Sequence, residues 1–180
     1  MISYKKRKIY ALELDKPEFK NMMKVNLGCG KQIKPGWTNI DNEKQLGVDV
    51  VHNLEVLPYP FQSNTVDFIY MSHVLEHLDN PYEVILECHR ILKHGGLLEI
   101  LVPHFKDYKS SLSMPHKRFF HEHSIHCFIE DEYSCQSKNI FSLELCIVSH
   151  RFPLLHRFTG LFNNSFFGWT SEIHWILKKR

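Results

Sequence analysis

The feature that most constrains this chain is the run KVNLGCG at residues 24–30, followed by a second short stretch that ends in Asp41. The first stretch predicts a strand that closes in a turn at Gly28, Cys29 and Gly30. Glycine permits a tight turn at the end of a strand and leaves room for a ligand against the backbone. A carboxylate ending the next strand is placed to accept hydrogen bonds from a ribose. The two elements together predict a nucleoside-binding crevice.

The turn does not favour a dinucleotide. Ile33 stands where the dinucleotide fingerprint has its third glycine, which allows a helix to pack closely on its strand. Pro35 and Gly36 then shorten the connection, so the helix N-terminus that would hold a pyrophosphate is poorly formed. A nucleoside without phosphates fits this pattern better than NAD.

Composition and charge indicate one globular domain spanning residues 1–180. The chain has 43% hydrophobic and 23% charged residues, which excludes an extensively disordered protein. Its formal net charge is only +2, so there is no general electrostatic argument for a nucleic-acid partner.

The cysteines and apolar runs bear on the compartment. Five cysteines in no ligand-like spacing favour a reducing environment. The N-terminus lacks the apolar run of a signal peptide, and no window is apolar enough for a membrane span. We therefore expect a cytoplasmic protein with no membrane partner.

Strands and helices are expected to alternate after residue 41. Strands are predicted at 47–51, 66–71 and 97–102, with one helix that begins at Asp79 or Asn80 before Pro81 and stops at the His94-Gly95-Gly96 turn. Short Pro- and Asn-containing stretches replace the other crossover helices. This alternation is typical of a parallel sheet.

The remainder of the chain is less regular. Residues 104–140 form a polar insertion rich in histidine and aromatic residues, with a helix expected somewhere in 124–133. Within 141–180, strands are expected at 142–149 and 172–177, at one edge of the sheet with the last one antiparallel. A short helix near 17–21 or a basic lead-in precedes the first strand. The predicted fold is α/β: a Rossmann-like, doubly wound, mostly parallel sheet with an antiparallel edge strand and shortened crossover helices.

Five successive segments resemble the motifs of class I S-adenosylmethionine-dependent methyltransferases, and most closely the small stand-alone, type 11-like proteins. These segments are VNLGCG, NID, VHNLEVLPYPF, VDFIYMSHVLEHL and RILKHGGLLEILVP, and they cover residues 24–103 in order. The PHF and PHKRFF runs beyond them are more loosely similar to a subgroup associated with bacterial surface-glycan gene clusters. The resemblance implies that residues 24–103 are the cofactor-binding half and that 104–140 lies on the acceptor side.

The resemblance also implies a cofactor site for S-adenosyl-L-methionine. The turn residues would hold its methionine part, Asp41 its ribose, and Asn53 with Leu54 its adenine, while Ser72 and His73 would lie beside the sulfonium; the turn residues are Leu27, Gly28, Cys29 and Gly30. Asn53 departs from the acid usual in the family, but its carbonyl oxygen can still accept a hydrogen bond from the adenine amino group.

Methyl transfer to an oxygen or nitrogen of a small molecule or saccharide is aided by a base that titrates near neutrality. Histidines follow the fourth and fifth predicted strands at the edge where ligands bind. His104 is the preferred base, followed by His77 and then His73. The simpler alternative is that Glu76 and His77 only anchor their loop through hydrogen bonds.

Two further alternatives concern the histidine-rich insertion and the small size of the chain. His116, His121, His123 and His126 could form a metal-dependent, hydrolase-like site, but three or four ligands must converge, and on a helix positions 121 and 123 point apart. We assign no metal ligands from the sequence. The chain could also be a non-catalytic cofactor-binding subunit that scaffolds or activates a partner.

Overall fold

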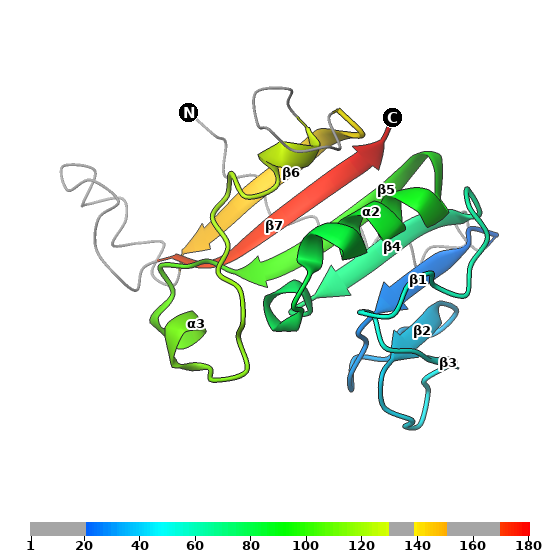
Figure 1. Cartoon of the computed structure of the whole chain (residues 1–180), viewed down its shortest axis with the longest axis horizontal. Helices are drawn as coiled ribbons and strands as arrows, with labels where there is room; N and C mark the ends of the chain where they lie inside the picture. Colours follow the sequence, from blue (N-terminus) through cyan, green and yellow to red (C-terminus); the bar gives the residue numbers. More distant parts are fainter. Residues whose placement is uncertain (1–20, 130–138, 151–169) are drawn as a thin grey trace.

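The computed structural model describes residues 21–129, 139–150 and 170–180. Seven strands form a single sheet in the order β3-β2-β1-β4-β5-β7-β6 (Figure 1). The strands are β1 (Lys24–Leu27), β2 (Thr38–Asp41), β3 (Val50–Val51), β4 (Val66–Ser72), β5 (Leu92–Pro103), β6 (Phe141–His150) and β7 (Thr170–Lys179). The helices are η2 (Leu75–His77), α2 (Pro81–Ile91), α3 (Tyr108–Leu112) and η3 (His126–Phe128).

The pairing of the strands confirms the predicted fold class. The first five strands are parallel to one another, and β1 pairs with both β2 and β4. Strand β7 is antiparallel to β5 and to β6. The antiparallel strand thus lies one position inside the edge, which is formed by β6.

The helix before β5 ends earlier than the glycine pair suggested. Helix α2 ends at Ile91 and β5 begins at Leu92, so the predicted stop at residues 94–96 was wrong. The loop before β4 ends the helix, because Asn64 and Thr65 donate their amides to the carbonyls of Arg90 and Ile91. The buried ammonium of Lys179 binds the carbonyl of Leu92 at 2.8 Å.

Other local differences lie at the ends of the chain and in the insertion. The short helix α3 was not predicted, and β3 is shorter than the expected strand at 47–51. Within residues 124–129 the expected helix is the three-residue η3. Residues 130–138, and residues 17–20 of the helix expected at 17–21, lie outside the described residues.

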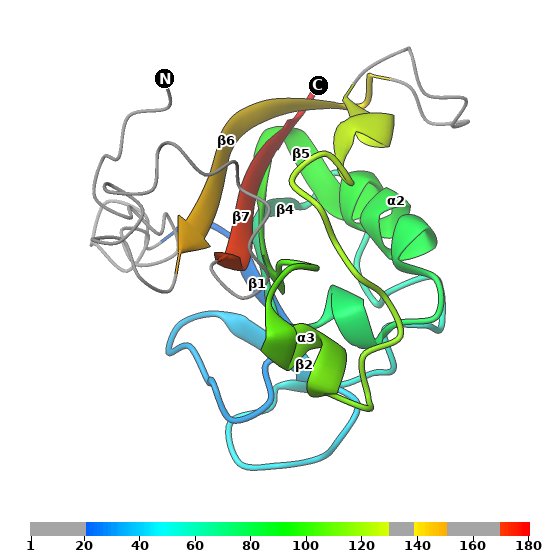
Figure 2. The same ribbon diagram turned by 90° about the vertical axis from the view of Figure 1, so that its left-hand side faces the viewer.

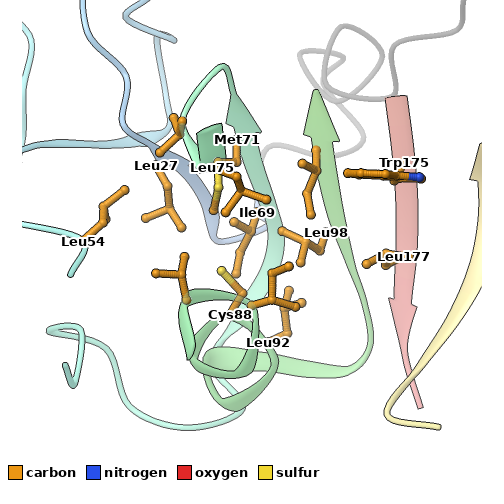
Figure 3. Close-up of a cluster of buried hydrophobic side chains, with 14 of the residues drawn as sticks. Leu27, Leu54, Ile69, Met71, Leu75, Cys88, Leu92, Leu98, Trp175 and Leu177 are labelled. Carbon is orange, nitrogen blue, oxygen red and sulfur yellow. The ribbon is translucent and has the colours of Figure 1, made fainter. Parts of the chain in front are cut away.

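The core lies between the sheet and α2, which covers one face of β4 and β5 (Figure 2). Proline at its first position starts the helix, and the side chains at helical spacing are buried beneath it. Figure 3 shows this cluster, in which the labelled side chains are Leu27, Leu54, Ile69, Met71, Leu75, Cys88, Leu92, Leu98, Trp175 and Leu177.

Buried amides take the place of the missing first crossover helix. In the stretch 21–129, α2 is the only α-helix that connects two parallel strands. The side chain of Asn39 accepts from Asn26 and from the Lys34 amide at 3.0 and 2.9 Å, and donates to the Lys34 carbonyl. These bonds fix the loop between β1 and β2, which carries the glycine turn. Among the described residues, none of the helices has the length and apolar character needed to cross a bilayer.

The packing of His89 predicts a dependence of stability on pH. Burial, together with the charges of Lys179 and His94, lowers the pKa of His89 from its ordinary 6.5 to about 4. The unfolded chain therefore takes up a proton at this side chain at a higher pH than the folded chain does. The stability contributed by neutral His89 is full above about pH 6.5 and is lost as the pH falls toward about 4.

We expect His89→Gln to flatten the loss of stability between about pH 6.5 and 4. Urea unfolding at several pH values across this range measures the free energy of unfolding of both proteins. If the free energy of unfolding falls with pH equally steeply in the variant and the wild type, another titrating group causes the loss of stability in this range.

Candidate functional site

A cleft of about 200 Å³ lies where the parallel strands end. Its lining comes from the segments that follow strands β1 to β4. These segments leave the sheet at the carboxyl ends of the parallel strands (Figure 1), which is the edge where open α/β sheets bind ligands. The lining residues are Gly28, Asp41, Asn42, Asn53, Leu54, His73, Val74, His77 and Leu78. Four separate loops thus contribute to a single site.

Gly28 is required by its backbone and by its neighbour. Its φ is +63°, which disfavours residues with a side chain. A Cβ at this position would lie 2.5 Å from Cγ2 of Val74, in the loop after β4. These two loops therefore approach each other closely, and both contribute to the lining of the cleft.

Asp41 joins the end of β2 to the glycine turn. Its Oδ2 accepts the Gly30 amide at 2.7 Å, and its Oδ1 accepts the Glu43 amide at 3.2 Å. A carboxylate offers about four acceptor positions, so two remain for a ligand in the cleft. This geometry suits the hydrogen bonds of a ribose diol.

Asn53 and Leu54 present a polar and an apolar surface to the cleft. The Oδ1 of Asn53 accepts the Glu55 amide at 3.0 Å, which fixes the side chain. The hydroxyl of buried Tyr59 donates to the Leu54 carbonyl at 2.9 Å and holds that residue in place. A polar and an apolar surface side by side can contact a flat, partly polar ring.

Five of the nine residues expected at the cofactor lie in the lining; the others are Leu27, Cys29, Gly30 and Ser72. Leu27 and Cys29 are buried, and burial raises the pKa of the Cys29 thiol, so these two positions offer mainly backbone groups. Ser72, at the end of β4, is half-buried and directly precedes His73, which does line the cleft. Asn42, Val74 and Leu78 also line the cleft and were not predicted from the sequence, although each directly follows a residue that was.

His73 is held between two carboxylates. Its Nδ1 lies 3.2 Å from Oε1 of Glu76, and its Nε2 lies 3.4 Å from Oε1 of Glu172. The hydrogen bonds to Glu172 and Glu76 raise the pKa of His73 to about 9. An imidazolium at neutral pH has no lone pair, so this arrangement suits a positioning role better than that of a base.

His104 is buried and outside the cleft lining. Its Nδ1 accepts the Lys106 amide at 3.0 Å, which leaves the proton on Nε2, and Nε2 lies 3.0 Å from Oε2 of Glu122. Burial lowers the pKa of His104. Since both ring nitrogens have partners, the geometry does not favour our first choice of base.

The neighbouring His121 has the same tautomer. Its Nδ1 accepts the His123 amide at 3.2 Å, and its Nε2 lies 3.3 Å from the same Oε2 of Glu122. A metal ligand needs a lone pair on the coordinating nitrogen, but here the Nε2 atoms of His104 and His121 carry protons toward the carboxylate. His123 and His126 instead contact each other, with Nδ1 and Nε2 at 3.1 Å.

His77 has the opposite arrangement. It lines the cleft, and its Nδ1 lies 3.3 Å from the Pro115 carbonyl, which can only accept. In its neutral form the ring therefore keeps its lone pair on Nε2. Of the three histidines proposed as bases, His77 is the one that combines a place in the cleft with such a lone pair.

The strand order with an antiparallel β7, and the cleft beside a glycine turn and a strand-ending acid, define the fold of the class I S-adenosylmethionine-dependent methyltransferases. Residues 25–100 match the family model described as "Methyltransferase domain", of the Methyltransf_11 type. Residues 25–100 thus match a methyltransferase domain of the class that the motifs predicted, and the strand order of the described sheet agrees with that class.

Solved structures share the fold over nearly the whole chain. A SAM-dependent methyltransferase from Archaeoglobus fulgidus is 17% identical with a TM-score of 0.61, and the alignment covers 97% of this chain and 95% of the Archaeoglobus chain. A SAM-dependent methyltransferase from Mesorhizobium loti is 14% identical with a TM-score of 0.60, and the alignment covers 94% of this chain and 96% of the Mesorhizobium chain. A geranyl diphosphate methyltransferase in complex with SAM is 12% identical with a TM-score of 0.61, covering 89% and 79%. A search of curated proteins gave no significant match.

Proposed function

We propose that this methyltransferase acts on an oxygen or nitrogen of a small molecule or saccharide, with residues 104–129 on the acceptor side. The observation that carries this proposal is the meeting of the cofactor residues and His77 in one cleft. The expected cofactor residues around it are Gly28, Asp41, Asn53, Leu54 and His73. Cofactor binding and proton removal would thus occur at adjoining positions.

S-adenosylmethionine, when bound, supplies an electrophilic methyl group on a positively charged sulfur. The chain must align the acceptor in line with that group and exclude water. His73 with Glu76 and Glu172 carries a net charge of about −1 when the histidine is protonated, which favours a nearby cation. This triad would help to orient the sulfonium end.

His77 is now our preferred group for receiving the acceptor's proton. It lines the cleft and keeps a lone pair on Nε2, whereas His104 donates from Nε2 and His73 is protonated near neutrality. General-base catalysis contributes about 10²–10⁴-fold to a rate. The order of the three candidates from the sequence is therefore revised.

We expect His77→Asn to lower turnover by about 10²–10⁴-fold while leaving cofactor affinity nearly unchanged. The loss in the matched variant His104→Asn is expected to be smaller. Formation of S-adenosylhomocysteine with a library of hydroxyl and amine acceptors measures turnover, and calorimetry measures the affinity. A larger loss in His104→Asn would restore His104 as the base.

The same assay separates catalysis from the alternative of a scaffolding subunit. Both functions require cofactor binding, but only the enzyme forms S-adenosylhomocysteine in the presence of an acceptor. Binding without product across the whole acceptor library would favour the non-catalytic subunit.

A further inference from the structure

We propose that Glu76, His77 and His116 form a binding site for a divalent transition-metal ion at the rim of the cofactor cleft. One possible ligand atom from each residue lies within 4.8 Å of the other two. The rings of His77 and His116 meet edge to face, with centroids 4.9 Å apart. Two imidazoles and a carboxylate are a common ligand set for zinc and for non-haem iron.

Both histidines have the tautomer that a metal requires. The Nδ1 of His77 lies 3.3 Å from the Pro115 carbonyl, and the Nδ1 of His116 lies 3.1 Å from the Ser110 carbonyl. A carbonyl only accepts, so each Nδ1 carries the proton and each Nε2 keeps its lone pair. Metal-ligating histidines are typically oriented in this way by a backbone carbonyl or carboxylate.

Glu76 supplies an unsatisfied, fully buried carboxylate. Its Oε1 is 3.2 Å from Nδ1 of His73, but its Oε2 is buried with no hydrogen-bond partner among the described residues. Such an oxygen is costly away from water unless a donor or cation meets it. A metal ion between Glu76 and the two histidines would satisfy it.

The backbone holds the three residues together across a long sequence separation. The Glu76 carbonyl accepts the amides of Lys117 and Arg118 at 2.7 and 3.1 Å, which docks the insertion onto η2. His116 directly precedes this docked segment. The position of His116 next to His77 is therefore fixed by the fold.

A second cluster, formed by two histidines and a glutamate, can be compared with the proposed metal site. Atoms of His104, His121 and Glu122 also lie within 4.8 Å of one another. There, however, both Nε2 atoms carry protons, because both Nδ1 atoms accept backbone amides. Proximity alone predicts two metal sites, whereas the tautomers select the one formed by Glu76, His77 and His116.

The chemistry of the ligands sets the preference among ions. Imidazole nitrogens favour zinc and iron over magnesium, which prefers oxygen ligands and retains water. At bond lengths of about 2.0–2.2 Å, the ligand atoms of a tetrahedral site lie about 3.3 Å apart. The candidate ligand atoms here lie within 4.8 Å of one another, so binding an ion would bring any two of them closer by about 1.5 Å at most. We expect Zn²⁺ to bind more tightly than Mg²⁺.

For catalysis this inference rests on the proposed methyl transfer and narrows its acceptor to a hydroxyl group. Three protein ligands leave a position for the acceptor oxygen, whose proton passes to solvent as the pKa of the hydroxyl falls. The oxygen then bonds to the methyl carbon while the electron pair of the carbon–sulfur bond returns to sulfur. The products are a methyl ether and S-adenosylhomocysteine. With the ion bound, the Nε2 lone pair of His77 holds the metal, and this role replaces that of receiving the acceptor's proton.

The test is a Zn²⁺ titration of the full chain after treatment with EDTA, with a competing chelator and calorimetric detection. We expect one Zn²⁺ per chain, bound about 10–100-fold more weakly by His116→Asn and by Glu76→Gln. His121→Asn, from the other cluster, is expected to bind as the wild type does. Thermal unfolding of each variant identifies any that has not folded, and His116→Asn alters only a half-buried side chain.

The inference is overturned if the wild type binds no stoichiometric Zn²⁺, if His116→Asn and Glu76→Gln bind it undiminished, or if His121→Asn alone loses it. Titration with S-adenosylhomocysteine in EDTA keeps the two proposals separate. Cofactor binding and methyl transfer without Zn²⁺ binding would remove only the metal site. Zn²⁺ and cofactor binding without methyl transfer to any acceptor would remove the proposed function.

Discussion

Replacing Gly28 with valine is expected to weaken binding of S-adenosylmethionine by at least about 100-fold. A side chain at φ +63° is strained by about 1–3 kcal/mol, and overpacking against Val74 adds about 1–3 kcal/mol. The structure can relieve this only by moving the loops after β1 and β4, which line the cleft. Calorimetric titration with the cofactor measures the loss.

A glycine outside the site separates backbone strain from the steric clash. Gly36 has φ +75°, but a Cβ there would meet nothing within 4 Å, so Gly36→Val is expected to lower stability while preserving affinity. The clash itself is tested by Gly28→Ala with and without Val74→Ala, since truncating Val74 removes the atoms 2.5 and 3.0 Å away. Equal affinity of Gly28→Val and the wild type would exclude this turn from the cofactor site.

Replacing Asp41 with alanine is expected to weaken cofactor binding by about 1.5–3 kcal/mol, or about 10–150-fold, the range for a hydrogen bond to a charged group. Asp41 lines the cleft with two of its acceptor positions in use, at Gly30 and Glu43. The loss includes the effect of releasing the Gly30 amide. Calorimetry with S-adenosylhomocysteine measures it without turnover.

Two further variants isolate the role of the Asp41 carboxylate. Asp41→Asn keeps an oxygen able to accept the Gly30 amide, so its affinity should fall between those of the wild type and the alanine variant. Glu43→Ala removes an exposed acid nearby and should leave the affinity unchanged. Unchanged affinity in Asp41→Ala would contradict the assignment of this residue to the ribose.

The sequence predicted the parts of the site that depend on local backbone. The turn at Gly28 and the acid at Asp41 are each set by a strand and the residues that follow it, so their spacing indicated the cleft. Likewise the spacing of apolar residues predicted α2 and β4. The Methyltransf_11 match and the strand order confirm the class inferred from these motifs.

The sequence could not predict features set by contacts between distant segments. Helix α2 ends at Ile91 because residues 64 and 65 bind its last carbonyls. The tautomer of His104 depends on the Lys106 amide, and that of His116 on a carbonyl in α3. The choice among the histidines therefore required the backbone surrounding each ring.

The most direct test of the account is a calorimetric titration of the chain with S-adenosylhomocysteine, with NAD in a parallel titration. We expect one S-adenosylhomocysteine per chain and no binding of NAD, because β1 and β2 are joined by a loop without the helix N-terminus that would hold a pyrophosphate. Failure to bind S-adenosylhomocysteine, or binding of NAD in its place, would contradict the assignment of the cleft.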